Sequence, residues 1–206
     1  MDEIIRHCKI RAGSDRAFSL LELLVVLAIV SVLAALSFSS LVSSLAGSKL
    51  NSAGQIVADS IGLARQEAVA RDRNVQVRFY QITNGTFQGW CALQLLRVEQ
   101  TSSGAALVPV THVILLPDGV IISASSTLSP LLTADTALQG TVALPIYGNT
   151  AYAGFYFLPS GSVESALNNA NNFITLQNAT ATGSPPANYS TVQIDTISGK
   201  VTTYRP

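Results

Sequence analysis

Glu22 is the one charged residue between Phe18 and Leu36, a stretch of nineteen residues that is otherwise largely apolar. A helix needs about 20 apolar residues to cross a bilayer, so this stretch is long enough to span a membrane. A carboxylate inside such a helix costs roughly 2.5–3.5 kcal/mol on insertion scales, which makes an accidental acid there unusual. The chemistry open to Glu22 is that of a counter-ion, and we expect a partner molecule to supply the cation.

Few other side chains combine the residue types that catalysis or metal binding needs. His112 is the single histidine after position 17, and it stands in an apolar stretch where packing explains it better than catalysis. Asp118 belongs to a Pro-Asp-Gly turn, whose geometry accounts for the aspartate. The sequence contains no Gly-x-Ser-x-Gly, no His-Glu-x-x-His and no phosphate-binding loop. We predict that the protein is not an enzyme and that it needs no cofactor and no metal.

The residues from Ala17 to Glu22 resemble the processing site of type IV pilin-like proteins. In that family a short basic leader is cut off before a Phe, the new N-terminal residue is methylated, and a Glu stands at the fifth mature position. The resemblance implies cleavage between Ala17 and Phe18, N-methylation of Phe18 and an assembly role for Glu22. Ala17 departs from the family pattern, which usually has Gly there. The leader, residues 1–17, carries four basic side chains: Arg6, Lys9, Arg11 and Arg16.

The role of Glu22 follows from the amine that such a cleavage would create at Phe18. A free α-amine has a pKa near 7.7–8.0 and is mostly cationic at neutral pH. Neither this amine nor the Glu22 carboxylate is stable alone in a low-dielectric surrounding. When helices stack with a stagger, Glu22 of one subunit can pair with the amine of a neighbour. The pair would then set the register of the growing filament.

Three other interpretations of this segment stay open. A secretory signal has a shorter apolar core of 7–15 residues, followed by small residues at the cleavage site. A permanent single-span anchor explains everything except Glu22 and the Phe18 boundary. Glu22 near the start of the helix could also reach the membrane edge. In each membrane case the basic residues before the span predict a cytoplasmic N-terminus and an extracytoplasmic remainder.

The two cysteines, Cys8 and Cys91, constrain the redox chemistry. Removal of the leader would leave Cys91 alone, so no internal disulfide could form. A buried apolar thiol in a strand is the more ordinary interpretation of Cys91, and a bridge between two copies stays open.

Downstream of the apolar stretch the sequence predicts a continuing helix to about Arg73. One face of this part carries apolar residues at helical spacing: Leu50, Val57, Ile61, Ala64 and Ala68. We therefore expect four parts. They are the leader at 1–17, a transmembrane and filament-core helix at 18–46, an amphipathic rear half of that helix at 47–73, and a β head domain at 74–206.

The head reads as antiparallel β structure. Val75, Val77 and Phe79 alternate with polar residues and tyrosine, which predicts a half-buried strand, and the Asn84-Gly85 dipeptide predicts a tight hairpin. Further strands are expected at residues 90–98, 107–116, 120–123, 152–158, 173–177, 191–196 and 200–203, with polar loops at 125–140 and 178–188. The fold class is α+β, with the long helix laid on an antiparallel head of two sheets.

Three further segments resemble the minor pseudopilin and fimbrial T family (GspH/FimT): Ile61–Val77, Phe157–Gly161 and Ile194–Val201. Their order along the chain matches the helix-to-strand junction, a Gly-turn strand end and the closing hairpin of that family. The resemblance implies a minor, tip-proximal subunit. A narrower resemblance, through Trp90–Gln94, is to the prepilin-type cassette protein D of verrucomicrobia.

DNA binding is the main alternative function. Lys200 and Arg205 are the candidate DNA contacts, with Tyr204 between them as a stacking platform. The whole chain has zero net charge, and the mature part would hold eight basic and nine acidic residues. Two cations are few for useful phosphate affinity. An exposed strand end with ordinary charges explains them better.

The sequence thus predicts a structural subunit of a type IV pilus or a type II secretion pseudopilus. Its partners would be a prepilin peptidase, other pilins or pseudopilins through the N-terminal helix, and the bacterial inner membrane. The subunit would wait in that membrane before assembly into the filament.

Overall fold

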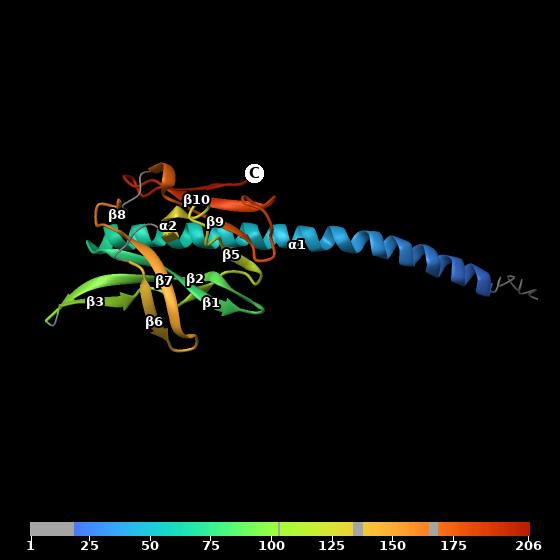
Figure 1. Cartoon of the computed structure of the whole chain (residues 1–206), viewed down its shortest axis with the longest axis horizontal. Helices are drawn as coiled ribbons and strands as arrows, with labels where there is room; N and C mark the ends of the chain where they lie inside the picture. The colour runs from blue at the N-terminus through green and yellow to red at the C-terminus, as the bar shows by residue number, and fades with distance from the viewer. Residues whose placement is uncertain (1–18, 103, 134–137, 165–168) are drawn as a thin grey trace, which may run out of the picture. The chain divides into compact units, whose positions relative to one another are not determined.

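A computed structural model describes residues 19–102, 104–133, 138–164 and 169–206, with the backbone alone at 35–43 (Figure 1). The chain divides into two compact units, Met1–Ser43 and Ser44–Pro206. The predicted leader and the predicted cleavage position lie outside the described residues.

Helix α1 covers Leu20–Arg71 and belongs to both units. It ends close to the predicted Arg73 because Asp72 adopts a left-handed conformation, with φ of 52°. The amide of Arg73 then donates to the carbonyl of Ala68 at 3.2 Å. This is the Schellman arrangement that commonly ends a helix, with Asp in place of the more frequent Gly. Within the described residues, no helix meets the combined length and hydropathy that a membrane crossing requires.

The rear half of α1 packs by the face that the sequence predicts. All five residues of that face are fully buried: Leu50, Val57, Ile61, Ala64 and Ala68. They share one core cluster with residues of β1, β2 and β7 and also with residues of β9 and β10. Figure 1 shows these two groups of strands on opposite sides of the helix. The helix is therefore the centre of the core of the second unit.

The described residues contain eleven strands, a short helix α2 (Pro130–Thr133) and a 3-10 turn η1 (Asn169–Asn171). The strands are β1 (Val75–Asn84), β2 (Phe87–Thr101), β3 (Gly104–Pro109), β4 (Ile114–Leu115), β5 (Val120–Ile122), β6 (Gly140–Leu144), β7 (Gly148–Phe157), β8 (Val163–Glu164), β9 (Phe173–Asn178), β10 (Tyr189–Ile194) and β11 (Val201–Tyr204). The observed fold is therefore α+β, with an N-terminal helix and an antiparallel sheet.

The prediction of two sheets is wrong for the described residues, whose strands form one sheet. The order along it is β11-β10-β9-β5-β2-β1-β7-β6, with β3, β4 and β8 attached at the sides. The long strand β2 pairs with β1 along one edge and with β3, β4 and β5 along the other. The link to β5 rests on the pair Trp90–Ile122. This short ladder joins two groups of strands that would otherwise be separate sheets.

Four predictions about the head need correction. The strand expected at 107–116 is split, because the amides of Val110 and Thr111 both bond to the carbonyl of Leu95 and end the ladder of β3. The loop expected at 125–140 contains α2, and β6 was not predicted at all. The polar side of β1 is also buried, since Gln76 and Tyr80 are each 1% exposed. The prediction of a half-buried β1 is therefore wrong.

The predicted hairpin after β1 forms with a shifted centre. Asn84 pairs with Phe87, so the two connecting residues are Gly85 and Thr86. Gly85 has φ of 62°, a conformation that glycine adopts without strain. The amide group of Asn84 donates to the carbonyl of Leu116 at 2.9 Å and holds the hairpin against the neighbouring turn.

Gly154 offers a test of the ladder between β1 and β7. A Cβ atom at this position would lie 2.1 Å from the carbonyl oxygen of Val77. We expect Gly154→Ala to lower the free energy of unfolding by about 2 kcal/mol or more, because the strands must move apart. Urea unfolding of the full chain in detergent, followed by circular dichroism, measures the change.

Gly62→Ala is the matched control. A Cβ atom at Gly62 would meet no atom within 4 Å, and the residue lies inside α1. Alanine there should raise the free energy of unfolding by up to about 1 kcal/mol, because glycine is the poorer helix former. Equal stability of the two variants would contradict the predicted crowding at Gly154.

Candidate functional site

The first turn of α1 carries a Ser-x-x-Glu pattern at Ser19 and Glu22. The hydroxyl of Ser19 accepts a hydrogen bond from the amide of Leu21 at 3.3 Å, and its carbonyl accepts one from Leu23 at 3.1 Å. Ser19 is therefore the N-cap, and Glu22 occupies the third helical position, where acidic residues are favoured. The carboxylate also lies at the positive end of the helix dipole. Our sequence analysis missed this local role, although the pattern itself was the signal.

Large apolar side chains are exposed at consecutive positions of the same segment. Leu20 is 85% exposed and Leu33, near the other end of the segment, is 58% exposed. Because the positions are consecutive, they cover every side of the helix rather than one stripe. The exposed set is Leu20, Leu21, Leu23, Leu24, Val25, Val26, Leu27, Ile29, Val30, Val32 and Leu33. Such an apolar surface is typical of a segment that leaves water in the functional state.

Polar groups within this segment are few and mostly bonded locally. The hydroxyl of Ser31 donates to the carbonyl of Leu27 one turn earlier, which removes its need for water. Glu22 makes no ion pair with any described residue. Residues 19–43 contain no Lys or Arg, so this stretch supplies no cation of its own. Phe18 and Ala17 lie outside the described residues, and their predicted roles stay predictions.

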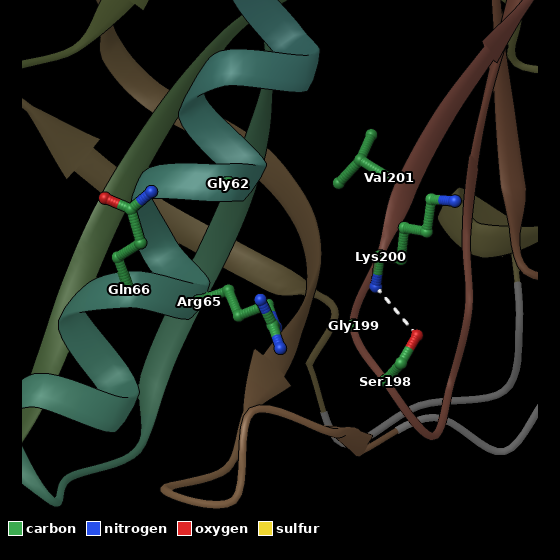
Figure 2. A pocket seen from close by; sticks show the side chains of 7 residues that line it. All are labelled: Gly62, Arg65, Gln66, Ser198, Gly199, Lys200 and Val201. Carbon is green, nitrogen blue, oxygen red and sulfur yellow. Dashed lines mark hydrogen bonds between the residues drawn. The ribbon is translucent and has the colours of Figure 1, made fainter.

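A second candidate surface lies in the Ser44–Pro206 unit, between α1 and the β10–β11 turn (Figure 2). The open groove has a volume of about 420 Å³. The stem of Arg65 lies against the turn, since a Cβ atom at Gly199 would sit 2.8 Å from its Cδ. The groove is lined by Gly62, Arg65, Gln66, Ser198, Gly199, Lys200 and Val201. Arg65 was not among the residues that the sequence singled out.

The terminal hairpin separates the two predicted DNA contacts. Lys200 lines a second shallow groove together with Tyr204 and Thr202, because these residues alternate along one face of β11. Figure 2 shows the Lys200 side chain extending away from Arg65. The guanidinium of Arg205 instead donates to the amide oxygen of Asn188 at 3.0 Å. DNA contact through Lys200 and Arg205 stays a prediction.

The other residues that the sequence analysis considered, His112 and Cys91, lie outside these two surfaces. His112 is exposed and lies between β3 and β4, so its expected packing in an apolar strand is wrong. Cys91 is 1% exposed, and its thiol donates to the carbonyl of Ile82 at 3.3 Å. Burial raises the pKa of the Cys91 thiol. No group of three metal-binding side chains occurs among the described residues.

The N-terminal segment matches a family model described as the prokaryotic N-terminal methylation motif, over residues 13–38. The match spans Ala17, Phe18 and Glu22. It confirms the type IV pilin-like character that the sequence predicts for this segment. No curated protein matches the chain.

Two solved structures of the minor pseudopilin EpsH from the type 2 secretion system of Vibrio cholerae are similar to the chain. The first is 17% identical, has a TM-score of 0.40, and covers 77% of this chain and 98% of that one. The second is 15% identical and has a TM-score of 0.42. This match covers 78% of the present chain and 96% of the EpsH chain.

Cys91 yields a prediction about thiol reactivity. Because the thiolate is the reactive form and burial disfavours it, iodoacetamide should label Cys91 in the folded chain on the order of 100-fold more slowly than in urea. Since the folded pKa is raised, the folded state should also lose stability as the pH rises above the ordinary thiol value. Mass spectrometry of the peptide containing Cys91 follows the labelling.

Ile197→Cys serves as the reference thiol, because Ile197 is 79% exposed in the β10–β11 turn. It should react at the rate of a free thiol in the folded chain. Rapid labelling of Cys91 under the same conditions would show that the strand opens or that the thiol is accessible.

Proposed function

We propose that the chain is a minor subunit of a type IV pilus or a type II secretion pseudopilus. The observation that carries this proposal is the exposed apolar surface of residues 20–33, which directly follows a predicted cleavage site inside the matched methylation motif. In this proposal residues 18–46 hold the precursor in the bacterial inner membrane. The same residues later form the core of the filament by packing against helices of other pilins.

The size of the exposed surface argues for two successive apolar environments. Burial of one Leu, Val or Ile side chain contributes about 1.5–3 kcal/mol. Even half of that for each of the eleven exposed side chains amounts to on the order of 10 kcal/mol. Water is therefore a poor final environment for this helix. The lipid bilayer before assembly and the helices of neighbouring subunits after assembly would both cover its apolar surface.

The magnitudes also favour an assembly role for Glu22 over a purely local one. Interaction with the helix dipole contributes about 0.3–1 kcal/mol at an exposed helix start. The cost of a carboxylate within an apolar helix is roughly 2.5–3.5 kcal/mol. The helix dipole thus offsets only part of the cost of the carboxylate, and a cation from outside the segment would have to offset the rest. The α-amine of Phe18 on a neighbouring subunit would satisfy it and would fix the stagger between the two helices.

A tip-proximal position and the remaining division of the chain belong to the same proposal. The resemblance of Ile61–Val77, Phe157–Gly161 and Ile194–Val201 to the GspH/FimT family supports a minor rather than a bulk subunit. Residues 47–73 and 74–206 would then form the head that contacts other subunits or cargo. No enzymatic step is part of this function.

Processing is the first test. We expect the mature protein to begin at Phe18 and to carry one methyl group on its N-terminal nitrogen. Ala17→Gly should raise the processed fraction, because the family usually has Gly before the cut, and Ala17→Leu should block processing. Intact-mass measurement of protein purified from cells with and without a prepilin peptidase gives the answer. A chain of full length in both would favour the permanent anchor instead.

Assembly is the second test. We expect Glu22→Gln to leave the protein folded and in the membrane but to reduce its incorporation into filaments at least about tenfold. The neutral amide keeps the size of the side chain and removes only the counter-ion, whose pairing is worth more than 1.4 kcal/mol in a low-dielectric surrounding. Immunoblotting of sheared filaments against the membrane fraction measures the ratio.

Asp59→Asn is the matched control, because Asp59 is an exposed acid on the rear half of the same helix. It should assemble as the unaltered protein does. Normal assembly of the Glu22 variant, or an equal defect in both, would remove the registering role from Glu22.

A further inference from the structure

Arg78 is a buried cation on the side of the sheet opposite to α1. The residue is 9% exposed and lies on β1 between β2 and β7. It forms no ion pair with any described residue. Buried charged side chains are almost always paired, because an isolated charge in a low-dielectric interior is costly. Arg97 shows the usual solution in this protein, since it bonds to both Glu67 and Glu99.

The groups around Arg78 are polar but neutral. Its Nε donates to the side-chain oxygen of Gln76 at 2.9 Å. Its guanidinium carbon lies 4.0 Å from the centre of the Tyr152 ring, a cation–π contact. The hydroxyl of the neighbouring Tyr80 donates to Gln94 at 2.9 Å. These dipoles orient the guanidinium, but no described group cancels its charge.

The tyrosines do not supply the missing negative charge. Burial raises the pKa of Tyr80, and the nearby Arg78 charge lowers it without reversing the rise. Burial likewise raises the pKa of Tyr156. Both phenols are therefore neutral at physiological pH. Glu164, which pairs with Tyr156 across β7 and β8, is exposed and forms no ion pair with Arg78.

The strand beside Arg78 presents two tyrosines on either side of a glycine. Gly154 is the direct partner of Arg78 in the β1–β7 ladder and carries no side chain. Tyr152 and Tyr156, two residues to either side of Gly154, are only half-buried. The guanidinium fork of an arginine has the donor geometry and the charge that recognise a planar anion, and the Tyr152 ring holds the fork of Arg78 in place.

We propose that Arg78, together with Tyr152 and Tyr156, binds a carboxylate group from outside the chain. The carboxylate accepts hydrogen bonds from the terminal nitrogens of the guanidinium and restores the charge balance. It can belong to a free carboxylic acid or to an acidic side chain of a neighbouring protein. The site is separate from α1 and does not depend on the proposed filament role.

The first experiment titrates the detergent-solubilised full chain with sodium acetate and follows arginine Nε–Hε resonances by NMR. The Arg78 resonance, assigned by its loss in Arg78→Met, should shift saturably. Sodium chloride at equal ionic strength and neutral acetamide should not reproduce the shift. Arg73, an exposed arginine whose guanidinium donates to the carbonyl of Asp72, is the internal reference and should respond at least about tenfold more weakly. Equal responses of the two arginines, or none at Arg78, overturn the proposal even if Arg78→Met fails to fold.

The second experiment identifies the source of the carboxylate. The photo-crosslinking residue p-benzoylphenylalanine replaces Tyr156 in cells, and the crosslinked peptide is sequenced. A protein source predicts an Asp- or Glu-containing peptide whose yield falls at least about tenfold with Arg78→Met and is unchanged with Arg73→Met. A saturable acetate shift without such a crosslink assigns the site to a free carboxylate. A crosslink that survives Arg78→Met, combined with no acetate shift, contradicts the site.

Discussion

A charged group in an apolar surrounding must find an opposite charge, and this constraint governs the N-terminal segment of the chain. Exposed Leu, Val and Ile side chains cover residues 20–33 on every side, and such a surface is more stable out of water. In the proposed function Glu22 leaves water with this segment. The helix dipole reduces the cost of burying the carboxylate but does not remove it. A methylation motif at the same place is coherent with this need, because cleavage would create a cation beside the acid.

The same helix meets a different environment in its rear half, and this explains the form of the sheet. Residues of α1 are fully buried there, and small ones stand among large ones: Leu50, Ala53, Val57, Ile61, Ala64 and Ala68. Small residues let strands approach the helix closely on more than one side. A Cβ atom added at Gly54 would lie 3.0 Å from the hydroxyl of Ser190 on β10. One sheet can therefore pack against the helix with both of its strand groups.

Local patterns determined what could be predicted from sequence, and long-range pairing determined what could not. The buried face of α1 and the apolar side of β1 could be predicted from residue spacing. The joining of two strand groups rests on the pair Trp90–Ile122, which no local pattern specifies. Glu22 was identifiable because a lone acid in an apolar run is unusual, and the Ser19 cap was visible in the same residues but was overlooked. Arg65 could not be identified, because only the fold brings it beside the terminal hairpin.

The alternation of apolar and polar residues identifies the apolar face of a strand, but it does not show whether other residues cover the polar face. Arg78 on β1 is an example. The alternation in residues 75–80 predicted a half-buried strand, whereas the sheet also buries Arg78, on the polar side, among neutral dipoles. Arg78 and Glu22 thus pose the same physical problem with opposite signs, since each lacks an ion-pair partner among the described residues. Replacing a buried charge by an apolar residue is often neutral or stabilising for a fold. The burial of Arg78 therefore supports the proposed carboxylate contact, just as the apolar surrounding of Glu22 supports its proposed pairing with an α-amine.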